Sequence, residues 1–133
     1  MKVTKFGGSS MADATQYRKV RDIVLADPDR KVVVVSAAGK RHSKDHKLTD
    51  LLYLCYSHTK YGVECDPVFD MIKDRYCGIR DELGIELDLE SDFAALKARI
   101  DNNQQTQALM AAMGAQTQAI INALKPATAA AAG

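Results

Sequence analysis

The sequence predicts an α/β fold with a parallel sheet, on the basis of three observations. Residues 1–4 and the β-branched run 31–35 have the character of strands, the segment between them has helical periodicity, and each strand leads into a turn that contains glycine. A strand, a helix and a second strand in this order form a right-handed βαβ unit. Because both strand ends then lie at one edge of the sheet, the turns at Gly7-Gly8 and Gly39 are expected to face one crevice.

The elements of this unit follow from their residues. Residues 14–26 are predicted to be helical because Tyr17, Val20 and Val24 fall on one stripe, with Asp13 as N-cap and Pro28 as a stop. The uninterrupted valines of 31–35 are typical of a strand that is covered on both faces, as in a parallel sheet.

Three further helices are expected after the second strand. One begins near Leu48 and runs to about residue 60, a second covers 66–83 and stops at Gly84, and a third covers 89–100. Thr49 has two interpretations: its hydroxyl either caps the first of these helices or belongs to a site. The many carboxylates of these helices are interpreted as a solvated face.

The composition changes after residue 101, which predicts a boundary between residues 1–101 and an Ala/Gln-rich helical tail at 102–133. From Asn102 onward Lys125 is the only charged residue, and the tail helix is expected to end before Pro126. Its apolar stripe is either a packing surface or a self-association surface, and consists of Leu109, Met113, Ile120 and Leu124.

Length and charge favour a single cytoplasmic domain. The chain has 133 residues and a net charge of +1, from 18 Lys plus Arg against 17 Asp plus Glu, which gives no support to a nucleic-acid or membrane partner. No signal peptide or membrane-spanning run is recognisable. The cysteines are expected to be reduced thiols, and the histidines lack a metal-ligand pattern, so no metal site is assigned (Cys55, Cys65, Cys77; His42, His46, His58).

The peptide Lys5-Phe6-Gly7-Gly8-Ser9 places a cation, two glycines and a hydroxyl after the first strand. Glycines let the backbone approach a ligand closely, and a turn that leads into a helix presents amides to an anion, so this peptide is a candidate phosphate cradle. A simple tight turn is the alternative, and the peptide is not a Walker loop. The cationic segment 40–47 is either a solvated loop or a cover for an anionic ligand.

Three motifs together resemble the N-terminal signatures of aspartokinases, members of the amino-acid kinase superfamily. They are Lys5-Phe6-Gly7-Gly8-Ser9-Ser10, Val33-Val34-Val35-Ser36-Ala37 and Lys47-Leu48-Thr49-Asp50-Leu51-Leu52, and their order and separation also agree. The resemblance covers about residues 1–101. It implies a three-layer αβα kinase fold and ATP-dependent phosphorylation of the β-carboxylate of L-aspartate, with Mg²⁺ arriving on the nucleotide.

Site roles also come from the resemblance. It places Lys5 as the catalytic residue against the transferred phosphate, with Gly7, Gly8 and Ser9 as further ATP-binding residues and Ser36 and Thr49 at the aspartate pocket. In this family the carboxylate itself attacks the γ-phosphorus, so no general base is required. The expected partners are the small-molecule substrates ATP and L-aspartate, together with further copies of the chain or the remainder of a kinase.

The chain also departs from the family pattern. The segment with the substrate-binding Glu, the nucleotide-binding half and the regulatory domains find no counterpart after residue 101. We therefore expect an incomplete kinase fold and a fragment that is catalytically incompetent by itself. Two alternatives stay open: another amino-acid kinase that acts on acetylglutamate, carbamate or a nucleotide, and a self-associating helical module with a vestigial phosphate-binding turn.

Overall fold

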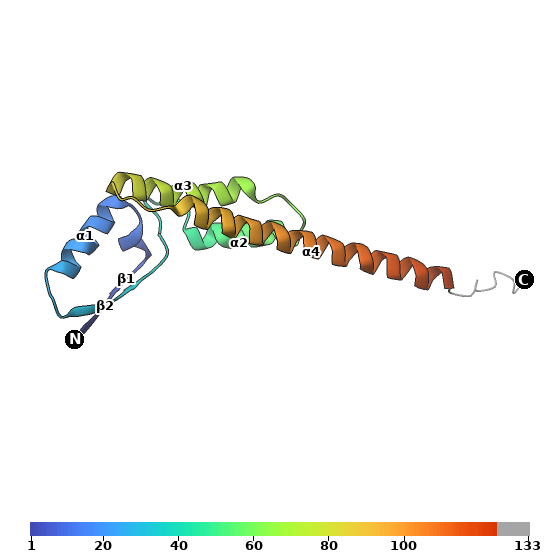
Figure 1. Ribbon diagram of the computed structural model, residues 1–133, viewed down its shortest axis with the longest axis horizontal. Coiled ribbons are helices and arrows are strands. Elements are labelled where there is room, and N and C mark those ends of the chain that lie inside the picture. Colours follow the sequence, from blue (N-terminus) through green and yellow to red (C-terminus); the bar gives the residue numbers. More distant parts are fainter. Residues whose placement is uncertain (125–133) are drawn as a thin grey trace, which may run out of the picture.

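The computed structural model describes residues 1–124, apart from the side chain of Thr106. Within these residues, two strands and four α-helices follow one another (Figure 1). Their bounds are β1 (Lys2–Phe6), the short 3-10 helix η1 (Gly8–Met11), α1 (Ala14–Leu25), β2 (Arg30–Val35), α2 (Leu48–Lys60), α3 (Asp66–Leu83) and α4 (Leu89–Leu124). The fold is therefore mixed α/β and mostly helical.

The sheet has two strands among the described residues, and they are parallel as predicted. Phe6 lies opposite Val35 in the register, so the two strands end level with each other. The prediction that the valine run is covered on both faces is wrong for this chain, because Val32 to Val35 are all exposed and Val35 is 55% exposed. β-Branched residues favour a strand, but whether the strand is buried depends on which other elements pack against it.

Helix α1 begins where its cap predicts. The Asp13 carboxylate accepts a hydrogen bond of 2.9 Å from the Gln16 backbone N–H, which satisfies one of the unpaired donors of the first turn. The helix does not follow the glycine pair directly, because η1 intervenes. In η1 the Ser10 N–H donates to the Gly7 carbonyl at 3.1 Å, so the first strand enters a tight turn before the helix starts.

The hydrophobic core lies between α2, α3 and the segment that follows β2. Its buried members are Ala38, Leu48, Leu51, Cys55, Cys65, Val68, Phe69 and Ile72. Helix α3 has the predicted bounds and ends at Gly84, whose φ of 65° is the left-handed conformation that favours glycine. The three cysteines are free thiols, and burial raises the pKa of Cys55 to about 11.

Helix α4 is one continuous helix of 36 residues that runs across the composition change at residue 102. Its first turns pack on the core, where the Phe93 ring lies 6.0 Å from that of Phe69. Its second half extends away from α2 and α3 as a rod (Figure 1). The predicted stop before Pro126 lies outside the described residues. Over residues 1–124, no helix combines the length and the hydropathy that crossing a membrane requires.

Candidate functional site

The two glycine turns meet at the ends of β1 and β2, which confirms the predicted convergence. The Gly39 N–H donates to the Gly8 carbonyl at 2.8 Å. A Cβ placed on Gly39 would lie 2.6 Å from the Gly8 carbonyl carbon and 2.9 Å from the Ser9 nitrogen, a separation that side-chain-bearing residues do not reach. Close approach of two backbones therefore requires glycine here, and neither residue has a positive φ.

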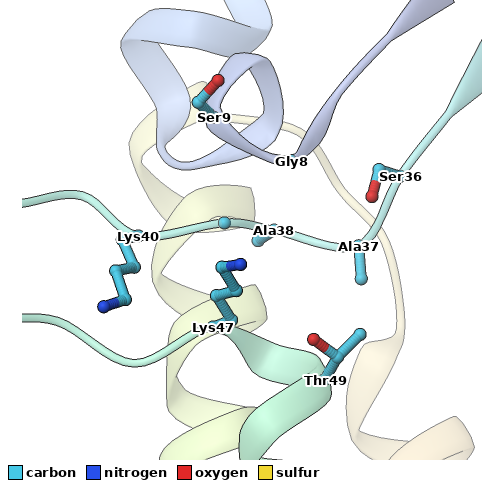
Figure 2. Close-up of a pocket in the computed structure, with 9 residues that line it drawn as sticks. Gly8, Ser9, Ser36, Ala37, Ala38, Lys40, Lys47 and Thr49 are labelled. Atoms are coloured by element: carbon cyan, nitrogen blue, oxygen red, sulfur yellow. The ribbon is translucent and has the colours of Figure 1, made fainter.

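A cavity of about 460 Å³ opens beside this contact (Figure 2). It is lined by the two turns and by the start of α2, through Gly8, Ser9, Ser36, Ala37, Ala38, Gly39, Lys40, Lys47 and Thr49. Two lysines and three hydroxyl groups border it, and there is no carboxylate among the lining residues. A neighbouring hollow of about 480 Å³ is apolar instead, and is lined by Thr49, Leu52, Tyr53 and Tyr56.

Helix α2 is fixed against the second turn by its first residue. The Leu48 N–H donates to the Ala38 carbonyl at 3.2 Å, and the buried Leu48 side chain enters the core. The N-cap is Lys47, without a side-chain hydrogen bond, so the interpretation of Thr49 as the N-cap is wrong. The exposed Thr49 side chain instead borders the cavity, as Figure 2 shows.

The structure brings most of the predicted site residues together. Gly8, Ser9, Ser36 and Thr49 all line the cavity. Lys5 and Gly7 do not: Lys5 is an exposed residue of β1 paired with Val34, and Gly7 precedes η1 with no atom within 4 Å of an added Cβ. No group of three or more His, Cys, Asp or Glu residues suited to a metal ion occurs within residues 1–124.

The cationic segment 40–47 divides between two environments. Lys40 and Lys47, at its two ends, line the cavity. Arg41 instead binds Asp45 within the loop: its Nε lies 2.7 Å from Asp45 Oδ2 and its Nη2 lies 2.9 Å from Oδ1. The hydrogen bonds from Arg41 hold the pKa of Asp45 well below its usual range, and they outweigh burial, which acts to raise it. The loop is thus neither wholly solvated nor wholly directed at the cavity.

Sequence reasoning missed Arg75, which is buried on α3 and contacts the second glycine turn. Its Nη2 donates to the Gly39 carbonyl at 2.5 Å and to the Ala12 carbonyl at 2.8 Å, and its Nη1 lies 3.1 Å from Asp45 Oδ2. A signal was present in the sequence, since Arg75 falls on the stripe of Val68, Ile72 and Ile79 at helical spacing. A cation on an apolar stripe requires buried acceptors.

This arrangement suits an anionic group such as a phosphoryl group. Two lysines supply positive charge, the hydroxyls supply donors, and the glycines let the two turns meet closely at the edge of the cavity. The start of α2 adds the positive end of a 13-residue helix at the same wall. An α/β segment of this kind has the features of a phosphate-binding region.

Comparison with known proteins shows which phosphate-binding proteins this chain is similar to. The chain is 46% identical over 83 residues to aspartokinase 3 of Bacillus subtilis and 35% identical over 85 residues to the chloroplastic aspartokinase 2 of Arabidopsis thaliana. These matches cover 62% and 63% of the chain but only 18% and 15% of the relatives. The chain therefore spans less than a fifth of the curated relatives it matches. No family model matches.

A solved structure agrees with the sequence matches. The aspartate kinase of Clostridium acetobutylicum, described as an allosteric enzyme, superimposes with a TM-score of 0.73 at 49% identity, over 75% of this chain and 23% of that one. The chain carries a partial aspartokinase region and is related to the aspartate kinase enzymes.

Proposed function

We propose that this region contributes part of the active site of an aspartate kinase, which transfers the γ-phosphoryl group of ATP to L-aspartate and forms ADP and 4-phospho-L-aspartate. That reaction is the first step toward lysine, threonine and methionine. One observation carries the proposal: both glycine turns and the start of α2 border a single cavity with two lysines, within a segment related to aspartokinases. The free cysteines are in keeping with a cytoplasmic location.

The proposed roles follow the resemblance. Lys5, Gly7, Gly8 and Ser9 act on the phosphates, while Ser36 and Thr49 bind aspartate. Phosphoryl transfer between two anions depends on alignment and on neutralising negative oxygens, and ATP brings Mg²⁺ with it. Within the region, Lys40 and Lys47 would reduce the repulsion between the two substrates, because they stand at the same cavity as the predicted aspartate residues.

We propose that residues 1–101 form this kinase part of an αβα three-layer fold and that 102–133 form an Ala/Gln-rich tail, although α4 runs through residue 102 without a break. A two-stranded parallel sheet with exposed valines does not by itself make a stable sheet domain, so the kinase part is expected to work with the remainder of a kinase. The chain alone, given ATP, Mg²⁺, aspartate and hydroxylamine, should form no aspartyl hydroxamate above the blank. Clear turnover by the chain alone would refute this incompetence.

The catalytic assignment can be tested in a chimera. The matching segment of the Bacillus subtilis relative is replaced by that of this chain, and aspartyl hydroxamate formation is measured. Activity of the chimera is expected, and Lys5→Met should lower kcat/KM by at least about 100-fold, the usual cost of removing one charge-stabilising donor.

Lys2→Met is the matched control for Lys5→Met. Lys2 lies on the same strand and binds Asp27 at 2.6 Å in an ion pair whose lysine side chain is 61% exposed. Such surface pairs contribute little, so activity should stay within about twofold of the parent chimera. Equal losses in the two variants would count against a special role for Lys5.

Self-association is a second candidate function, favoured by the second half of α4. Its apolar stripe is exposed, with Leu109, Met113 and Ile120 each more than half accessible. Residues 102–124 carry no charged side chain, so two copies would meet without like-charge repulsion. We propose that this stripe pairs with the same stripe of another copy.

Sedimentation velocity tests this second function. The full chain should sediment as an oligomer that dissociates when Leu109, Met113 and Ile120 are all changed to Gln. Ala115→Gln, which adds the same side chain on the other side of the helix, should leave the oligomer intact. If the full chain is still monomeric at about 100 μM, any self-association has a Kd weaker than that concentration, and the proposed pairing is ruled out.

A further inference from the structure

Arg75 joins three segments that are far apart in the sequence. Its guanidinium contacts the Ala12 carbonyl before α1, the Gly39 carbonyl after β2, and the far arm of the 40–47 loop through Asp45 and the His46 carbonyl, the last at 3.4 Å. All four acceptors surround one guanidinium, and the side chain of Arg75 is only 6% exposed.

The Asp45 carboxylate is the counterpart of this guanidinium in the loop. It is the only acidic residue between Lys40 and Lys47, its side chain is 8% exposed, and it binds Arg41 and Arg75 together. Its Oδ2 also accepts the Arg41 backbone N–H at 2.9 Å, which closes the loop on itself. The two arms of the loop are therefore tied to each other and to α3.

These ties end next to the two lysines of the cavity. Gly39 precedes Lys40, and His46 precedes Lys47, so Arg75 holds the peptide carbonyl adjacent to each lysine. Both lysines line the cavity (Figure 2), whereas Arg75 is not among its lining residues. Burial, followed by the nearby Arg41, lowers the pKa of Arg75, but an arginine stays protonated at neutral pH.

We propose that Arg75 is a positioning residue that fixes the 40–47 loop so that Lys40 and Lys47 flank the anion cavity, and that it thereby sets the affinity of the cavity for a phosphate group. The affinity part rests on the proposed function. Arginine suits the role because its planar fork can reach several acceptors at once, whereas the lysine ammonium is a compact point charge.

Pyrophosphate binding to the full chain tests the proposal. The titration is followed through the ¹⁵N–¹H amide signals of Gly8, Gly39 and Lys40, under conditions where each variant is folded. In Arg75→Lys the Kd for pyrophosphate should rise by at least about tenfold, the size expected when a charged contact is misplaced. The heteronuclear NOE of residues 40–47 should also fall, because the loop is no longer tied to α3.

The matched control is Arg80→Lys. Arg80 lies on the same helix and also forms ion pairs, with Asp81 at 2.9 Å and Glu90 at 2.6 Å, but it does not border the cavity. The Kd of Arg80→Lys for pyrophosphate should stay within about twofold of the parent value, because ion pairs with exposed carboxylates contribute little. A role in stability alone would lower the melting temperature of Arg75→Lys while the folded protein bound pyrophosphate as the parent does, and that result would overturn the proposal.

A double-mutant cycle asks whether Arg75 acts through the lysines. In a Lys40→Met, Lys47→Met background, Arg75→Lys should no longer change the Kd, since the groups it positions are gone. Full additivity would contradict the proposal. If Arg75→Lys does not fold, Asp45→Asn is the substitute variant. It should loosen the loop in the same way and raise the Kd for pyrophosphate at least about threefold. The loss is smaller because only one partner of the network is changed.

The outcomes separate this proposal from the proposed function. If the parent chain does not bind pyrophosphate, the phosphate site is refuted, and the heteronuclear NOE alone then decides on Arg75: a loosened loop in Arg75→Lys supports its positioning role, and an unchanged loop refutes it. If the parent binds and Arg75→Lys binds equally well, the phosphate site stands and the role of Arg75 is refuted.

Discussion

Replacing Gly39 by alanine should separate the two glycine turns and destabilise the fold by about 3 kcal/mol, the sum of an overpacked contact and a lost backbone hydrogen bond. The added Cβ would lie 2.6, 2.8 and 2.9 Å from backbone atoms of Gly8 and Ser9. Backbone atoms cannot turn aside as a flexible side chain can, so the strand ends must move apart. The Gly39 N–H then loses the Gly8 carbonyl, and the Gly39 carbonyl moves away from Arg75.

Two other glycines of the same turns make a graded control. Gly8→Ala would place its Cβ 3.3 Å from the Ala37 carbonyl oxygen, which is tight but can relax, whereas Gly7→Ala meets nothing within 4 Å at a φ of −78°. Urea unfolding should therefore rank the losses Gly39 above Gly8 above Gly7, with Gly7→Ala near zero or slightly stabilising, because alanine restricts the unfolded chain. Equal losses at Gly39 and Gly7 would show that the close approach is absent in solution.

Local sequence predicted the elements well where periodicity and caps agree. Helix α1 begins after its Asp13 cap, and α3 ends at Gly84, because a cap or a left-handed glycine is a local property. Of the two interpretations of Thr49, the capping role fails because this favoured capping residue is the second residue of α2 and Lys47 is the N-cap. The start of α2 is decided instead by the Leu48 contact with Ala38, which is far enough along the chain to be invisible in a local pattern.

The sequence predicted which segments form the candidate site, but not the contacts that hold these segments in place. The order of strand, helix and strand was enough to bring Gly8 and Gly39 to one edge of the sheet. Which cations of the loop face the cavity was not predictable, since it depends on Asp45 binding Arg41 and Arg75 on the other side. The exposure of the valines in β2 shows the same limit, because a β-branched run reports strand propensity and not what covers it.

Replacing Leu48 by alanine should cost about 2–5 kcal/mol, the range for emptying a buried leucine site. Leu48 is 1% exposed, and it packs in the core between the segment after β2 and helix α3. It is also the residue whose N–H binds Ala38, so a cavity there loosens the junction that places Thr49 at the site. A loss of that size is a large share of the stability of a small domain, which is about 5–15 kcal/mol.

Leu52→Ala isolates the contribution of burial. Leu52 lies one turn further along α2 and is the same residue type, but it is 46% exposed, so its truncation should cost less than about 1 kcal/mol. The free energy of unfolding from urea titration distinguishes the two variants, and the Thr49 and Ala38 amide shifts should move in Leu48→Ala alone. Comparable losses at both positions would mean that α2 does not use this face to pack on α3. The position of the start of α2 at the cavity would then be wrong as well.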